Sequence, residues 1–520
     1  MELVAAMLEP EFYPHAPQRV ELRETHISWV FLADERAYKV KKPLVLPFLD
    51  YGTREQRHLM CREEVRLNRR LAAEIYLGVV GLACAGGRWS LTEEHDPRAI
   101  EHAVEMLRVE EDRSLAALID RGEGRSSDVV AVARHIARFH SQAAVAPEKQ
   151  RRIEVLLETL EENLTTLEEA GRRVLDASRL QAARRFTSAF VAVRRAELEA
   201  RARSGLVRDC HGDLRAEHVI VSPDRGLYVY DCVEFNPGLR QIDVAADLGF
   251  LVMDLARLGA DALVADLIRE YRQAGGDAGD DGLISFFASY RAWVRAKVAC
   301  LRARELTEGG SERPRVQAEA RDLLALGHRF AWAARRPLVL VICGVPATGK
   351  TTLAKALAAI SGWDHISSDL TRKQLAGLAP AERGGEGTYA PEMTMRAYSV
   401  MGSTAADALA RSGGVIVDAT FHRRAERTVF QAGLGRPDAR LVFVECRAAA
   451  AVLAERIRRR ERDPGRVSDA DLSVLEQQLA GWEELGELPD AAQAQLDADS
   501  PTHELVTEVE AILDRFLGAG

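Results

Sequence analysis

Continuous apolar runs in the C-terminal third of the chain predict the strands of a buried parallel sheet. The runs cover residues 337–343, 413–420 and 441–446, and helix-forming stretches separate them. A strand covered on both faces is apolar at nearly every position, whereas a half-exposed strand alternates between apolar and polar residues. Residues 336–520 therefore predict an α/β domain built around a parallel sheet.

A half-exposed β-hairpin is predicted near the N-terminus. Residues 24–42 alternate apolar and polar positions around a polar turn at Asp34, with strands expected at residues 28–32 and 37–41. Residues 101–109 form another run of strand length. Because successive side chains of a strand point to opposite faces, the two lysines of the second hairpin strand share one face.

Residues 54–71 predict a helix that follows the hairpin. Leu59, Glu63, Leu67 and Leu71 are four apart, so we expect them on one face of this helix. A glutamate on an otherwise apolar face needs a cationic partner. A lysine of the neighbouring hairpin is the natural candidate, and two solvated side chains are the alternative.

Composition and charge narrow the classes of protein that the chain can represent. The 520 residues are 47% hydrophobic and 29% charged, as in ordinary globular proteins. The net charge of −9 disfavours nucleic acid and anionic membranes as partners. The seven cysteines include no C-x-x-C pair, and the first residues lack the basic stretch of a signal peptide. We therefore expect a cytoplasmic protein with no membrane segment.

Changes in pattern predict three structural parts. Helical periodicity dominates residues 128–200, and the polar stretch at residues 335–337 precedes the first strand of the C-terminal sheet. We expect an N-terminal lobe at residues 1–110, a helical lobe at residues 111–335 and the α/β domain at residues 336–520.

The sequence GVPATGKTT, residues 344–352, directly follows the first apolar strand and precedes a helix. This G-x-x-x-x-G-K-T spacing in a strand–loop–helix context predicts a phosphate-binding loop. Gly344 and Gly349 let the backbone N–H groups turn inward, Lys350 adds a positive charge, and Thr351 offers a hydroxyl to Mg²⁺, with Thr352 beside it. The alternative, a simple glycine-rich turn, is disfavoured because the strand and the helix are both present.

A second polar constellation lies in residues 206–231. The turn His211-Gly212-Asp213-Leu214 precedes a predicted hairpin that ends at Asp231. A short hairpin would bring the two carboxylates to the same region. Phosphoryl transfer uses such a pair, one carboxylate as the base for the acceptor hydroxyl and one on Mg²⁺.

On these motifs, residues 20–300 resemble aminoglycoside phosphotransferase-like kinases, a branch of the protein-kinase fold. The resemblance implies a bilobal α+β domain in which Asp213 positions the acceptor hydroxyl and Asp231 holds Mg²⁺. It further implies that Lys39 contacts the nucleotide phosphates, with Lys41 as an alternative, and that Glu63 is the helix partner of this lysine.

The sequence departs from this family at two places. His218 stands where the family has an asparagine that binds a second Mg²⁺, so His218 is the candidate ligand there, although imidazole is a poor ligand for a hard cation. A glycine-rich loop is replaced by residues 25–28. The domain could catalyse phosphoryl transfer slowly, could use a single metal ion, or could have become a binding module. We expect Asp243 and Asp247 to be structural.

Three polar residues follow the strands of the C-terminal sheet. Asp369 and Arg372 are three apart at a predicted helix start, and Asp418 ends a buried strand. Ligands of open α/β sheets bind beyond the carboxyl ends of the strands. Asp418 is therefore a candidate magnesium residue, whereas Asp369 with Arg372 is either an acceptor-site pair or an ordinary helix cap.

An arginine-rich stretch follows the fourth strand of this domain. Arg456 and Arg460 are four apart and could reach one phosphate group from a lid, although a charge run is more often a solvated helix face. Residues 337–515 resemble P-loop kinases of the zeta-toxin and polynucleotide 5′-hydroxyl kinase type. That resemblance implies that Asp369 takes the proton of the acceptor hydroxyl beside Arg372 and Lys350.

Together these features predict a phosphotransferase with two nucleotide sites, which uses ATP or GTP with Mg²⁺ and a small hydroxylated acceptor. A polynucleotide 5′-hydroxyl kinase and a regulatory ATP-binding protein remain as alternatives. The sequence does not identify the acceptor or the oligomeric state.

Overall fold

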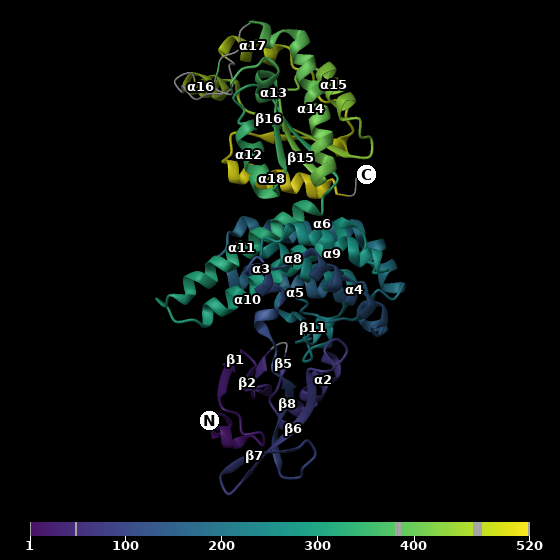
Figure 1. Ribbon diagram of the computed structural model, residues 1–520. Helices are drawn as coiled ribbons and strands as arrows, with labels where there is room; N and C mark the ends of the chain where they lie inside the picture. The colour runs from purple at the N-terminus through teal and green to yellow at the C-terminus, as the bar shows by residue number, and fades with distance from the viewer. Residues whose placement is uncertain (1, 47–48, 380–381, 383–385, 461–470, 518–520) are drawn as a thin grey trace. The chain divides into compact units, whose positions relative to one another are not determined.

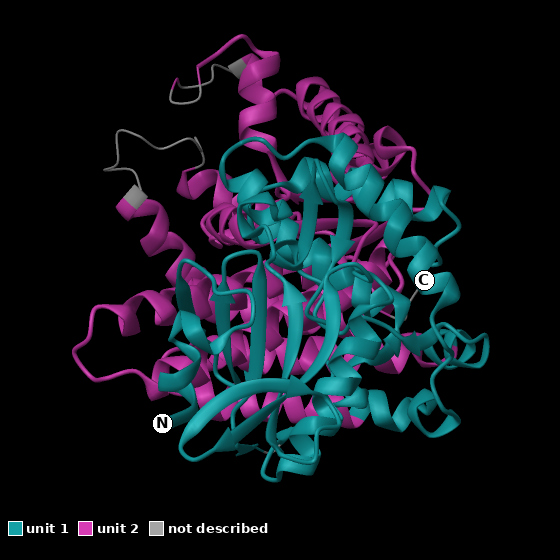
Figure 2. Cartoon of the chain, turned by 60° about the horizontal axis from the view of Figure 1, so that its bottom comes forward, with its two compact units in different colours: residues 1–157, 197–280 teal, residues 158–196, 281–520 magenta. Residues whose placement is uncertain are grey.

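The computed structural model describes residues 2–46, 49–379, 382, 386–460 and 471–517. The chain forms two compact units (Figure 2). Unit 1 comprises residues 1–157 and 197–280, and unit 2 comprises residues 158–196 and 281–520. The division into two compact units does not test the predicted limits of the three structural parts, so these limits stay a prediction.

Unit 1 contains a six-stranded antiparallel sheet of order β1-β2-β3-β8-β6-β7 (Figure 1). Its strands are β1 (Val20–Glu24), β2 (Ser28–Ala33), β3 (Arg36–Lys41), β6 (Tyr76–Ala85), β7 (Arg88–Glu93) and β8 (Ala99–Leu107). The predicted hairpin is confirmed, since Phe31 pairs with Tyr38 across β2 and β3. Short strands β4 (Val45–Leu46) and β5 (Leu49–Asp50) form a separate pair.

Helix α2 (Arg54–Asn68) packs against strands β6 and β8. The Thr53 hydroxyl caps its first turn by accepting a hydrogen bond from the Gln56 N–H. The predicted face is confirmed in part: Leu67 and Leu71 are buried as expected, whereas Leu59 is 54% exposed. The fully buried glutamate is Glu64, one residue after the predicted Glu63 and about 100° around the helix.

The remaining elements of unit 1 include the segments on either side of the polar turn at residues 211–214. The hairpin predicted after this turn is confirmed as β10 (Val219–Ser222) and β11 (Gly226–Val229). Strand β9 (Val207–Asp209) pairs with β12 (Gln241–Asp243), which leads into the buried helix α8 (Val244–Arg257). The other helices are α1 (Glu2–Met7), α3 (Leu115–Asp120), α4 (Ser126–Gln142), α7 (Pro237–Arg240) and α9 (Asp261–Gln273).

Unit 2 begins with long helices. Helices α10 (Asp281–Glu305) and α11 (Glu312–Ala333) pack along each other. Parts of α5 (Ile153–Gly171) and α6 (Ala177–Arg203) belong to the same unit.

The C-terminal part of unit 2 is a five-stranded parallel sheet of order β14-β15-β13-β16-β17. Its strands are β13 (Leu338–Cys343), β14 (Asp364–Ser367), β15 (Gly414–Asp418), β16 (Arg440–Arg447) and β17 (Gln493–Asp497). Its helices are α12 (Lys350–Ser361), α13 (Ser368–Leu375), α14 (Pro391–Ser412), α15 (Arg424–Leu434), α16 (Ala450–Arg460), α17 (Leu472–Ala480) and α18 (Thr502–Arg515). The predicted architecture is confirmed: a mixed part with an antiparallel sheet and helices is followed by a parallel sheet, with the predicted phosphate-binding sequence after β13.

The central strand β13 explains why its sequence is apolar at every position. Leu340 and Ile342 belong to a core with helices α12 and α18, whereas Val339 and Val341 belong to a second core with α14 and α15. Because both faces of the strand are buried, no polar residue interrupts it. Among the described residues, no helix combines the length and the apolar character that crossing a membrane requires.

Candidate active sites

The predicted phosphate-binding loop lies between β13 and α12 in unit 2. Gly344 and Gly349 have φ values of 139° and 89°, which side chains rarely adopt. A Cβ atom on Gly344 would also lie 2.5 Å from the carbonyl oxygen of Cys446. Gly349 directly precedes α12, so the loop places backbone N–H groups at the start of that helix.

Thr351 and Asp418 meet beside this loop. The Thr351 hydroxyl donates a 2.9 Å hydrogen bond to Asp418 Oδ1, and the Asp418 carboxylate is 2% exposed at the end of β15. Lys350 Nζ lies 3.4 Å from the carbonyl oxygen of Val345, and Thr352 is exposed in the same helical turn. A hydroxyl and a carboxylate oxygen at the head of a P-loop helix are the ligands that Mg²⁺ prefers.

His365 is a polar neighbour of this pair that sequence analysis missed. Its Nε2 atom contacts Asp418 Oδ2, the carboxylate oxygen that Thr351 does not use. His365 lies on β14, which pairs with β15. The order of the strands brings the two residues together across 53 positions of sequence, and no local signal reveals it.

Asp369 and Arg372 lie in the first turns of α13 and share a face, as predicted. The shortest distance between the guanidinium and the carboxylate is 3.5 Å, and Arg372 is buried. Their part in binding an acceptor stays a prediction.

The predicted arginine lid is described only in part. Arg456 Nη2 donates to the carbonyl oxygen of Ala498 at 3.0 Å, and Nη1 lies 3.5 Å from the carbonyl oxygen of Ala347 in the phosphate-binding loop. This places Arg456 next to the loop. The side chain of Arg460 lies outside the described residues.

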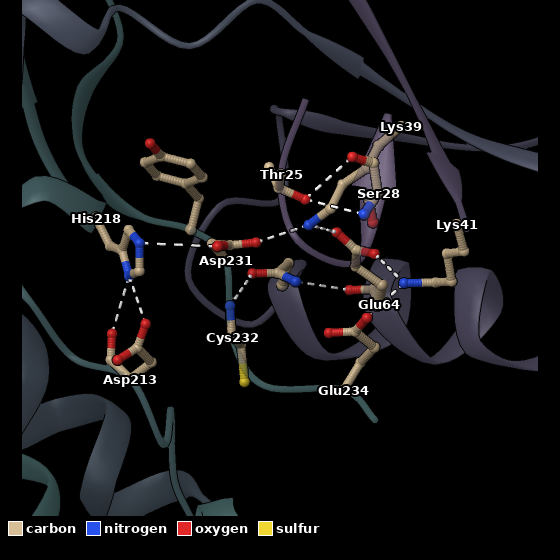
Figure 3. A network of polar contacts seen from close by, with 12 residues as sticks. Thr25, Ser28, Lys39, Lys41, Glu64, Asp213, His218, Asp231, Cys232 and Glu234 are labelled. Carbon is tan, nitrogen blue, oxygen red and sulfur yellow. Dashed lines mark hydrogen bonds and ion pairs between the residues drawn. The ribbon is translucent and has the colours of Figure 1, made fainter. Parts of the chain in front are cut away.

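Unit 1 contains a buried chain of charges (Figure 3). Lys39 Nζ donates to Glu64 Oε1 and to Asp231 Oδ1, both at 2.8 Å. The strand lysine therefore pairs with Glu64, and the prediction of Glu63 as its partner was wrong. Glu63 instead accepts hydrogen bonds from Arg66 and from Arg240. The physical reason is the rotation of α2, which turns Glu64 toward β3.

Lys41 extends this series of ion pairs into the interior of unit 1. Its Nζ atom donates to Glu64 Oε2 at 2.7 Å, and it also forms an ion pair with Glu234. The Lys41 side chain is fully buried, whereas Lys39 retains 13% exposure. Lys39 is therefore the lysine that a phosphate can reach, and Lys41 anchors Glu64 from behind.

The charges of this network stabilise one another. Burial alone would raise the pKa of Glu64, but Lys39 and Lys41 hold it below its ordinary value. Burial likewise opposes ionisation of Asp231, yet the charge and hydrogen bond of Lys39 hold the pKa of this carboxyl well below its usual range. Asp231 also has a left-handed φ of 63°, a strained conformation that is typical of functional positions.

Asp213 forms an ion pair with Arg215, a residue to which sequence analysis gave no role. Arg215 Nη2 donates to Asp213 Oδ2 at 2.9 Å, and Nε lies 3.0 Å from both oxygens. His218 Nδ1 donates to the carbonyl oxygen of Asp213 at 2.9 Å, which leaves Nε2 to accept from Arg215 Nη2 at 3.2 Å. Both nitrogens of His218 have protein partners, which argues against the predicted metal-ligand role.

Asp247 holds the turn that carries Asp213, as expected of a structural residue. Its two oxygens accept hydrogen bonds from the backbone N–H groups of His211 at 3.0 Å and Gly212 at 2.8 Å. Burial would raise the pKa of Asp247, but the hydrogen bond from His140 lowers it to about 2. Asp243 is structural too, since it caps α8 and pairs with Arg201.

Comparisons with known proteins match one part of the chain to a family model and other parts to solved structures. Residues 339–485 match the family model described as "AAA domain". Among solved structures, a choline/ethanolamine kinase family protein from Mesorhizobium loti is 14% identical, covering 64% of this chain and 99% of its own, with a TM-score of 0.39. A gluconokinase from Sinorhizobium meliloti is 24% identical, covering 35% of this chain and 94% of its own, with a TM-score of 0.27.

Relatives of the whole chain come from mycobacteria. The "Uncharacterized protein Rv2004c" of Mycobacterium tuberculosis and the "Uncharacterized protein Mb2027c" of Mycobacterium bovis are each 31% identical over 473 residues. The alignments cover 89% of this chain and 91% of each relative. This chain therefore belongs to the family of these mycobacterial proteins, and its C-terminal part, which carries the phosphate-binding loop, matches the model described as "AAA domain".

Proposed function

We propose that this protein is an ATP- and Mg²⁺-dependent phosphotransferase that transfers the γ-phosphate to a hydroxyl of a small acceptor. The observation that carries the proposal is the 2.9 Å contact between Thr351 and Asp418, at the start of a helix that follows a phosphate-binding loop. This hydroxyl–carboxylate pair combines with inward-facing N–H groups and Lys350 to suit a nucleotide triphosphate.

Different residues of the P-loop domain would bind the nucleotide, hold Mg²⁺ and orient the reacting groups. The N–H groups of residues 349–351 and the Lys350 ammonium would bind the β- and γ-phosphates. Thr351 and Asp418 would hold Mg²⁺, which neutralises charge on the transferred phosphoryl group when bound. Asp369 would accept the acceptor proton and Arg372 would orient the phosphoryl oxygens.

Unit 1 would provide the second nucleotide site. Lys39 would bind phosphate oxygens, and Glu64 keeps its side chain in place by an ion pair. Asp231 offers a carboxylate for Mg²⁺, since its Oδ2 atom lies 3.7 Å from His218 and only Oδ1 is bonded to Lys39. Asp213 would position the acceptor hydroxyl after its ion pair with Arg215 opens.

Net charge and free thiols support a small acceptor and a cytoplasmic location. A net charge of −9 disfavours a long polyanionic acceptor, so a small hydroxylated molecule fits better. All seven cysteines lie among the described residues as free thiols, which suits a reducing cytoplasm. ATP and GTP both satisfy the phosphate contacts.

The test uses the full chain with each site disabled separately. We expect Lys350→Ala to remove nucleotide turnover at the P-loop site and Asp213→Asn to remove turnover in unit 1, while Lys350→Ala with Asp213→Asn removes both. Each protein is assayed for Mg²⁺-dependent ATP consumption with sugars, aminoglycosides, nucleosides and oligonucleotides. Turnover by the double variant equal to that of the native chain would refute the proposal.

A polynucleotide 5′-hydroxyl kinase is the second candidate for the P-loop domain. The pairing of Asp369 with Arg372 at the head of α13 favours it. Transfer of labelled phosphate to the 5′ end of an oligonucleotide, lost in Asp369→Asn, would support this candidate. Transfer to sugars or nucleosides alone would exclude it.

A regulatory role for unit 1 is favoured by the bonding of Asp213. Both of its oxygens are occupied by Arg215, so the carboxylate is not open to an acceptor in this conformation. If unit 1 only senses ATP, the Lys350→Ala variant will bind nucleotide without consuming it. Steady Mg²⁺-dependent turnover by that variant would exclude the regulatory role.

A further inference from the structure

A histidine-rich cluster lies in the six-stranded sheet domain of unit 1, and neither candidate nucleotide site uses it. His58 belongs to α2, and Glu94 and His95 lie in the turn between β7 and β8. His58 Nε2 lies 2.9 Å from Glu94 Oε1, and His95 Nε2 lies 3.9 Å from Glu94 Oε2. One nitrogen or oxygen atom from each residue lies within 4.8 Å of the other two.

We propose that His58, Glu94 and His95 bind a divalent transition-metal ion of the Zn²⁺ class. Tetrahedral coordination at zinc, with metal–ligand distances of about 2.0–2.2 Å, separates neighbouring ligand atoms by roughly 3.3–3.5 Å. The separations of 2.9 Å and 3.9 Å lie on either side of this value. The ligand atoms of His58 and His95 are held only within 4.8 Å of each other, so forming the site also requires the exposed His95 side chain to move by up to about 1.4 Å.

Contacts with His102 restrain two of the proposed ligands. The ring of His102 stacks on that of His58 with centroids 3.7 Å apart and an angle of 4° between the planes. His102 is buried, and its Nε2 atom lies 3.2 Å from the carbonyl oxygen of Glu94. One residue thus restrains both the His58 ring and the Glu94 backbone.

Two exposed side chains at the cluster can move to admit a metal ion. Arg62 Nε lies 3.3 Å from Glu94 Oε1 and competes for the carboxylate, but its side chain is 61% exposed and can swing into solvent. His95 is 74% exposed and can likewise turn toward a metal.

The donor set favours one class of metal. Two imidazole nitrogens and one carboxylate oxygen suit Zn²⁺, Co²⁺, Ni²⁺ or Cu²⁺, whereas Mg²⁺ and Ca²⁺ prefer oxygen alone. Three protein ligands leave a fourth position for water or an external ligand. Since His58 is on the helix that carries Glu64, a bound ion would tie that helix to the β7–β8 turn.

The experiment titrates the reduced full-length protein with Co²⁺ as the probe and follows its visible spectrum. We expect one equivalent to give d–d bands without a thiolate-to-cobalt charge-transfer band, and Zn²⁺ to displace it. His95→Ala should abolish the bands, and because this residue is exposed the variant should fold. His58→Ala should do the same, whereas His503→Ala, an exposed histidine of α18, should leave them unchanged.

Thermal unfolding provides a readout that does not depend on the spectrum. Zn²⁺ should raise the Tm of the native chain and of His503→Ala, and should not raise that of His95→Ala. Equal cobalt binding by the native chain and His95→Ala, or a charge-transfer band showing that cysteines bind the ion, would overturn the proposal. Neither result depends on the kinase activity proposed above.

Discussion

Lys39 and Glu64 form a 2.8 Å ion pair in unit 1, and the second oxygen of Glu64 accepts a hydrogen bond from Lys41. One buried carboxylate therefore orients two lysines of the same strand. The more exposed lysine faces Asp231, and the buried one is anchored by Glu234. This arrangement links α2 to β3 through two ion pairs.

Replacing Glu64 should lower the free energy of unfolding far more than replacing the neighbouring Glu63. Glu64→Gln leaves two buried lysines short of a negative partner, so we expect a loss of about 3–5 kcal/mol in stability, with weaker nucleotide binding in unit 1. Glu63→Gln is the matched control, because Glu63 is part-exposed and Arg240 retains Asp209 as a partner. Urea unfolding and ATP titration in a Lys350→Ala background measure both effects. A larger loss in Glu63→Gln would contradict our assignment.

Lys41 should act as an anchor and not as a nucleotide ligand. Lys41→Met leaves the buried Glu64 and Glu234 without this cationic partner. We therefore expect a Tm several degrees lower. Adding Glu234→Gln should restore part of the loss, because the two side chains are coupled. Lys42→Met, which removes an ion pair to the exposed Glu24, should change Tm little. Additive effects of Lys41→Met and Glu234→Gln would show that the pair is not coupled.

The Thr351–Asp418 contact should control the response to magnesium at the P-loop site. Asp418→Asn and Thr351→Val should each reduce the Mg²⁺-dependent gain in ATP affinity by roughly 10- to 100-fold, the value of a hydrogen bond to a charged group. Thr428→Val is the control, since that hydroxyl is exposed and bonds only its own helix, to Arg424. Calorimetric titrations with Mg²⁺ and with EDTA measure the gain, in an Asp231→Asn background that removes the proposed magnesium carboxylate of unit 1. An unchanged magnesium dependence would remove these two residues from the site.

Acid should destabilise unit 2 through His328. Burial lowers the pKa of His328 to about 4, whereas the unfolded chain titrates near 6.5. Between these values the unfolded state binds more protons, so stability is full above pH 6.5 and falls as the pH drops toward 4, by about 3 kcal/mol from this residue.

The matched variants isolate this contribution. His328→Gln should flatten the fall in unfolding free energy between pH 6.5 and 4, whereas replacement of the exposed His503 by glutamine should leave it unchanged. Urea unfolding at half-unit steps of pH gives the slopes. A slope in His328→Gln as steep as in the native chain would show that His328 does not carry the effect.

Sequence pattern alone determined most of the elements and several local sites. The phosphate-binding loop, the strand before it and the helix after it are contiguous, so glycine conformation and apolar periodicity suffice to place Gly344, Lys350 and Thr351. The hairpin of β2 and β3 and that of β10 and β11 were likewise predictable, because alternation and turn residues are local signals.

Only the tertiary structure decided which side chains meet. The choice between Glu63 and Glu64 depends on the rotation of α2, which is set by packing against β6 and β8 and not by the helix itself. The contact of His365 with Asp418 depends on the order of strands in the sheet. Spacing along the chain fixes backbone geometry over a few residues, whereas partners distant in sequence are chosen by how whole elements pack, and that is a property of the folded chain.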